Sequence, residues 1–154
     1  MGEIVKYTIE YYIDKYEAAI GALSAYLPWL EQHKEQSVAQ DYKDSASTMA
    51  FPVYDSTLLA FVKQAQNTGL LDRNCVYLFN KRNIYNTQDE LRFIETAQLP
   101  DMDDLWNLLS YYVLEGMTVG TKWSEGVTNG IFFEVITKMQ GLMQAWGKEA
   151  VDNR

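Results

Sequence analysis

Few side chains in this sequence are of a type that could do chemistry. His33 is the only histidine and Cys75 is the only cysteine. A catalytic cysteine needs a base and a lowered pKa, and a general base must lie within hydrogen-bond reach of its proton. His33 lies in the polar stretch EQHKEQ, whereas Cys75 lies in the apolar run CVYLF, far from it in the sequence. We therefore expect a solvated histidine and a buried, inert cysteine.

Carboxylates are the second candidate chemistry, because Mg²⁺ favours oxygen ligands and all-helical nucleotide pyrophosphatases hold it with acids on facing helices. Glu31 and Glu35 are spaced to share one helix face. However, closely spaced glutamate pairs on two long helices are missing from the sequence. A single histidine and a single cysteine also exclude the usual zinc sets. We predict no catalytic residue, metal ligand or cofactor, and keep a metal-dependent nucleotide-processing enzyme as an alternative.

Negative charge is concentrated in one segment. The net charge is −8, from 21 acidic and 13 basic residues, which argues against direct binding of nucleic acid. Residues 93–134 contain seven acids and one base, Lys122. Asp101, Asp103 and Asp104 fill the expected first turn of a helix, where carboxylates oppose the helix dipole. A solvated surface explains such a segment, and so does a docking face for a basic partner protein.

Tyrosine is concentrated near the N-terminus. Five tyrosines lie within one predicted helix and surround more than one of its faces: Tyr7, Tyr11, Tyr12, Tyr16 and Tyr26. Tyrosine is enriched at interfaces because it combines a rigid apolar ring with a polar tip. These side chains either cover the edges of the core or form a homodimer seam or partner groove.

The elements that position these residues are predicted to be helices. Apolar residues follow one another at steps of three and four from Ile9 to Leu30, which predicts one buried face of a long N-terminal helix. Pro28 predicts a kink or a new helix there. The predicted helices cover about residues 6–26, 28–40, 56–69, 87–98, 101–115 and 131–146. Thr87 and Glu90 have the spacing of a capping box at the start of a helix. Residues 41–54 are predicted to form a loop, and the run CVYLF is predicted to form a strand or a short buried helix.

The fold class is therefore all-α, with one domain over residues 1–154, five or six helices and a frayed tail at 146–154. The sequence has no apolar run long enough to span a bilayer, and its N-terminal segment is charged. With one cysteine no intrachain disulfide forms. A cytoplasmic protein that does not bind membranes is expected.

Three short stretches resemble a bacterial family known as domain of unknown function 6508. They are Pro52-Val53-Tyr54 before a helix with Phe61-Val62, Glu115 followed by Gly120, and Gly130 before an aliphatic helix through Met139. The resemblance covers roughly residues 50–142. It implies a small, mostly helical cytoplasmic protein and no particular activity. The sequence lacks the family's arginine after Glu115, and its interval from Gly120 to Gly130 is one residue longer.

The function expected from these patterns is a non-catalytic protein–protein interaction module. The residues expected to bind the partner are Tyr7, Tyr11, Tyr12, Asp101, Asp103, Asp104, Glu115 and Trp123. A small acidic protein of this kind fits the cargo of phages and mobile elements. One concrete form is an inhibitor that occupies the basic nucleic-acid channel of a host enzyme. A structural homodimer is a further alternative.

Overall fold

The computed structural model describes residues 2–34, 39–41, 52–54, 56–119 and 121–152, with side chains for 10–34, 56–119 and 121–145. Within these ranges the chain forms eight α-helices, one 3₁₀ turn (η1) and two short strands. In order they are α1 (Gly2–Ser24), α2 (Leu27–Gln32), β1 (Ala39–Asp41), β2 (Pro52–Tyr54), α3 (Ser56–Asn67), α4 (Tyr77–Arg82), α5 (Thr87–Thr96), η1 (Leu99–Asp101), α6 (Met102–Glu115), α7 (Lys122–Thr128) and α8 (Ile131–Asp152). The prediction of a helical fold is confirmed, but five or six helices were too few.

The helix count differs because turns divide segments that the periodicity had joined. Helix α1 ends at Ser24, and Pro28 lies in the first turn of a separate α2, where its missing N–H costs no hydrogen bond. Helix α2 ends at Gln32, well before residue 40. A separate short helix, α7, lies between α6 and α8, and α8 continues to Asp152.

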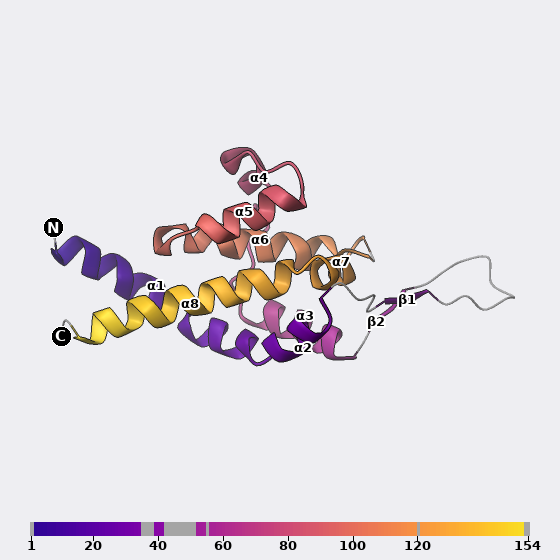
Figure 1. Ribbon diagram of the computed structural model, residues 1–154, viewed down its shortest axis with the longest axis horizontal. Helices are drawn as coiled ribbons and strands as arrows, with labels where there is room; N and C mark the ends of the chain where they lie inside the picture. The colour runs from indigo at the N-terminus through magenta and orange to yellow at the C-terminus, as the bar shows by residue number, and fades with distance from the viewer. Residues whose placement is uncertain (1, 35–38, 42–51, 55, 120, 153–154) are drawn as a thin grey trace, which may run out of the picture.

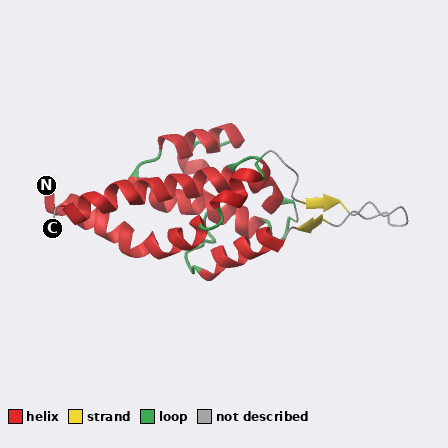
Figure 2. Cartoon of the chain, turned by 60° about the horizontal axis from the view of Figure 1, so that its bottom comes forward, coloured by secondary structure: helices red, strands yellow, loops and turns green. Residues whose placement is uncertain are grey.

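The apolar run CVYLF is not a strand. Cys75 and Val76 lie in the turns that lead into α4, which begins at Tyr77. The strands lie elsewhere: β1 and β2 pair antiparallel, with Ala39 opposite Tyr54 and Asp41 opposite Pro52. This pair projects from one end of the helical body (Figure 2). Most of the predicted loop 41–54 lies outside the described residues.

Helices α1, α6 and α8 enclose the core. Helix α8 runs along the length of the molecule, and α1 crosses it (Figure 1). Helix α2 lies on one side of α8, and α5 and α6 lie on the other. The N-terminal stripe is buried at Tyr16, Ile20, Leu23 and Leu30, as the spacing predicts. No helix in the described part of the chain is both long and apolar enough to cross a membrane.

Candidate functional site

The acidic residues at the start of α6 are bonded within the chain. Asp104 is buried, and both of its carboxylate oxygens accept from Lys81 Nζ, at 3.2 and 3.1 Å. Arg82 Nη2 joins two of the acids, at 2.6 Å from Asp104 Oδ2 and 2.7 Å from Asp101 Oδ1. The short helix α4 thereby compensates Asp101 and Asp104, two of the four acidic residues expected to face a partner.

Asp101 is also part of a helix cap. Its carboxylate accepts from the backbone N–H of Gln98 at 2.8 Å and completes a capping box around η1. Burial alone would raise the pKa of Asp101, but the Gln98 N–H and the Arg82 guanidinium outweigh it and lower that pKa. The negative form is therefore favoured by folding.

This shift predicts a pH dependence for Asp101→Asn. A carboxyl group with a lowered pKa contributes stability above its unfolded pKa, and that contribution is lost as the pH falls through its folded pKa. We expect the variant to lose about 1 kcal/mol of unfolding free energy at neutral pH and less in acid. Urea denaturation of both proteins across the acidic range measures the difference. A constant difference at every pH would contradict the assignment.

The tyrosines of α1 bind the same region from the other side. Tyr16 is buried, and its hydroxyl donates to the carboxylate of Asp103, which also accepts from Lys15 Nζ at 3.3 Å. Tyr12 is half-buried, and its hydroxyl donates to the carbonyl of Pro100 at 3.2 Å. Burial, followed by the bond to Asp103, raises the pKa of Tyr16. These contacts attach α1 to η1 and the first turn of α6.

The remaining predicted interface residues differ in their exposure. Tyr11 is 51% exposed, and its hydroxyl accepts from Lys15. Trp123 is half-buried and packs against the core, where its Nε1 donates to the carbonyl of Val113 at 2.8 Å. Glu115 is half-buried, and its carbonyl closes the turn after α6 by accepting from the N–H of Val119 at 2.8 Å. The side chain of Tyr7 lies outside the described residues.

His33 and Cys75 are not brought together as a catalytic pair. His33 is half-buried rather than fully solvated, because its ring stacks on Trp29 at 4.3 Å and its Nδ1 lies 2.8 Å from the Trp29 carbonyl. Cys75 is buried as predicted, and burial raises its thiol pKa. The described residues contain no group of three or more His, Cys, Asp or Glu side chains arranged to hold a metal ion.

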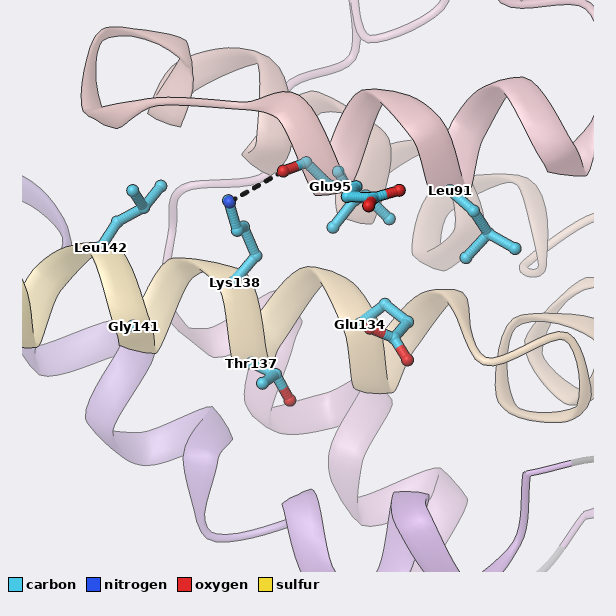
Figure 3. Close-up of a pocket in the computed structure, with 8 residues that line it drawn as sticks. Leu91, Glu95, Glu134, Thr137, Lys138, Gly141 and Leu142 are labelled. Atoms are coloured by element: carbon cyan, nitrogen blue, oxygen red, sulfur yellow. Dashed lines mark hydrogen bonds between the residues drawn. The ribbon is translucent and has the colours of Figure 1, made fainter.

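A groove between α5 and α8 is a feature at which a partner could be held. Its cavity volume is about 640 Å³. Apolar residues from both helices line it, namely Leu91 and Ile94 from α5 and Gly141 and Leu142 from α8. Glu95, Glu134 and Lys138 add charge, and Figure 3 shows side chains of the two helices facing each other across the opening.

The charges around the groove are only partly matched. Lys138 Nζ spans the opening to donate to the backbone carbonyl of Glu95 at 3.0 Å (Figure 3). Glu134 lies 3.6 Å from Lys34 Nζ, an ion pair open to solvent. The carboxylate of Glu95 is exposed and has no ion pair among the described residues. The groove therefore combines an apolar floor with one acidic and one basic side chain, Glu95 and Lys138, neither of which has an ion pair among the described residues.

Glu90 is a buried charged residue whose position sequence reasoning missed. The N-cap of α5 is Asn86, whose side chain accepts from the N–H of Asp89 at 2.8 Å, so the predicted cap at Thr87 is wrong. Glu90 instead faces inward, and its Oε2 accepts from the hydroxyl of Tyr112 at 2.6 Å. A glutamate facing a tyrosine inside a helical body requires the positions of α5 and α6, which the sequence alone does not provide.

Comparisons with known proteins give no further guidance to this site. They found no matching family model, no matching curated protein and no matching solved structure. The resemblance to domain of unknown function 6508 therefore stays a prediction. Any functional assignment has to come from the geometry of the chain.

Proposed function

We propose that this protein is a non-catalytic interaction module that holds a segment of a partner protein in the groove between α5 and α8. The observation that supports this proposal is the apolar floor of the groove, open along two adjacent helices. Grooves of this kind receive apolar side chains from a helix or an extended peptide. Covering the partly exposed Leu91 and Leu142 removes apolar surface from water, which favours association.

Gly141 supports a groove that is open rather than filled. A Cβ atom at this position would meet no atom within 4 Å. The residue lies inside α8, where glycine destabilises a helix by about 0.5–1 kcal/mol relative to alanine. A side chain there would favour the helix while occupying space in the groove. A binding role for that space offers a reason for the glycine.

The charge of the whole chain favours a basic partner. Glu95 and Lys138 bring opposite charges to the groove, and the whole chain has a net charge of −8. Opposite charges speed encounter and fix the orientation of a complex. A segment with apolar residues and a nearby Lys or Arg would match both features. A nucleic-acid-binding enzyme inhibited by this protein is one form that such a partner could take.

A second copy of the chain fits the groove less well than a basic partner. Two copies would each bring a charge of −8, so association would place like charges near one another. Two of the α1 tyrosines proposed for a homodimer seam, Tyr12 and Tyr16, already bind η1 and α6 within one chain. The homodimer therefore stays an alternative to the interaction module.

Filling the groove tests the proposal. We expect Gly141→Leu to reduce binding of the partner by at least about tenfold, because the new side chain occupies the space over the floor. The variant should unfold at a slightly higher temperature than the native protein, because leucine favours helix over glycine. Affinity capture with quantitative mass spectrometry, followed by titration with the purified partner, measures the loss.

Gly21→Leu is the matched control. Gly21 also lies inside a long helix and is exposed, and a Cβ atom there would meet nothing within 4 Å, but it is not part of the groove. A protein captured by the native chain and by Gly21→Leu, and lost from Gly141→Leu, supports the proposal. Equal capture by all three proteins would exclude the groove as the binding site.

A further inference from the structure

A second cavity, of about 350 Å³, lies where α5 begins beside α6 and α7. Phe79, Tyr85 and Tyr111 provide its aromatic lining, while Glu90, Lys122 and Glu125 are its charged residues. This volume is at the lower end of the range of small-molecule sites, about 300–1,000 Å³. The cavity shares no lining residue with the groove between α5 and α8.

Glu90 is the unusual group in this cavity. It is only 7% exposed, yet no ion pair involves it among the described residues. Its one side-chain hydrogen bond in this part of the structure is accepted from Tyr112 by Oε2, and Tyr112 in turn accepts from Asn129 Nδ2 at 3.1 Å. Buried carboxylates are costly unless they are paired. Burial raises the pKa of Glu90, and the Tyr112 bond offsets only part of that effect.

Lys122 acts on Glu90 through its charge, which lowers the pKa of Glu90, but its ion pair is with Glu125. Its Nζ lies 3.3 Å from Glu125 Oε1, and it also lies 4.9 and 4.7 Å from the ring centres of Tyr111 and Tyr112. Lys122 is therefore matched by Glu125, and these ring faces already accommodate a cation. With one lysine between two glutamates, the cavity is one positive charge short when Glu90 is ionised.

We propose that this cavity binds the guanidinium group of a small organic cation, which pairs with Glu90 and stacks against the aromatic lining. A guanidinium is planar and weakly hydrated, so it suits a carboxylate beside aromatic rings better than a compact ammonium does. Anions are disfavoured because two carboxylates border the space. A free metabolite and an arginine side chain of a peptide both carry such a guanidinium group.

The first test uses agmatine, titrated at constant ionic strength and followed by chemical-shift changes and calorimetry. We expect saturable binding to the native protein and at least about tenfold weaker binding to Glu90→Gln, which keeps an acceptor for Tyr112 but removes the charge. Glu31→Gln is the matched control, because Glu31 is an exposed glutamate of α2 that lines neither this cavity nor the groove. Binding by Glu90→Gln that equals native binding would overturn the proposal.

The second test uses a variant at the edge of the cavity. Tyr85 is 78% exposed, so Tyr85→Ala should fold normally and still weaken agmatine binding several-fold through loss of stacking. Agmatine binding should also weaken as the pH falls, because protonation of Glu90 removes its negative charge. The other charged and polar groups that face Glu90 are Lys122, Glu125, Tyr112 and Asn129. Absence of both effects would contradict the proposal.

A blocked tripeptide with a central arginine distinguishes the two sources. Tighter binding of agmatine than of the tripeptide indicates a free small molecule, and the reverse indicates a protein side chain; the absence of binding by either overturns the assignment. Gly141→Leu should bind agmatine as the native protein does. The cavity proposal and the groove proposal can therefore fail independently.

Discussion

Replacing Asp104 by alanine is expected to lower the free energy of unfolding by about 2–3 kcal/mol, because the change removes a buried carboxylate that accepts charge-assisted hydrogen bonds from Lys81 and Arg82. Asp104 compensates both Lys81 and Arg82, and it accepts from Arg82 at 2.6 Å. Without it, the Arg82 guanidinium retains only Asp101, at 2.7 Å, and α4 loses its polar attachment to α6. Denaturant unfolding at neutral pH, monitored by circular dichroism, measures the loss.

Glu134→Ala provides the comparison for Asp104→Ala. Glu134 also pairs with a lysine, Lys34, but at 3.6 Å and with 43% of its side chain exposed. Exposed pairs contribute about 0–1 kcal/mol, so this variant should change stability little. Equal losses in the two variants would show that the network at Asp104 is not special. A large loss in Asp104→Ala would also mean that weaker partner binding by a variant of this residue can result from unfolding rather than from a lost docking contact.

These acids show where sequence reasoning reaches its limit. The pattern Asp-Met-Asp-Asp correctly indicates the start of a helix, since a carboxylate there opposes the helix dipole. The partners of Asp104 are Lys81 and Arg82, more than twenty residues earlier, and no local rule connects them. The sign and position of the charge could be predicted from the sequence, but its neutralisation depends on how α4 packs against α6.

Glu90 shows a different limit. Thr87 and Glu90 fit the spacing of a capping box, but Asn86 is also a strong N-cap residue and occupies that position. A shift of one residue moves Glu90 from the cap to the buried face of α5. Helix ends are the least certain part of any pattern-based assignment, and here that uncertainty concealed the group on which the cation site depends.

The groove between α5 and α8 could be predicted only in part. The apolar spacing of both helices indicates which residues face inward, such as Ile94 and Ile136, which are buried. The groove arises because Leu91 and Leu142 remain only partly covered where the two helices meet. Partial coverage depends on the distance and angle between helices, which periodicity does not specify.

Gly116→Ala is expected to cost about 2–4 kcal/mol, although glycine is not needed there for backbone reasons. Gly116 caps α6 with φ −65° and ψ −15°, a conformation that alanine adopts readily. A Cβ atom would instead lie 2.1 Å from Cδ1 of Trp123. The indole would have to move, which would break its 2.8 Å hydrogen bond to the Val113 carbonyl. Denaturant unfolding measures the cost, and the indole N–H resonance reports the broken bond.

A double-mutant cycle with Trp123→Leu shows whether the cost of Gly116→Ala comes from the clash with the indole or from the backbone conformation of the turn. If the cost of Gly116→Ala comes from the indole, the same change should cost less than about 1 kcal/mol once the indole is gone. An undiminished cost would place its origin in the backbone of the turn instead. Gly141→Ala is the control for the substitution itself, and it should raise stability by about 0.5–1 kcal/mol because its Cβ enters open space within a helix. A loss of stability in Gly116→Ala together with a gain in Gly141→Ala would show that Trp123 holds α7 against the end of α6. Trp123 would then be a structural residue rather than one available for docking.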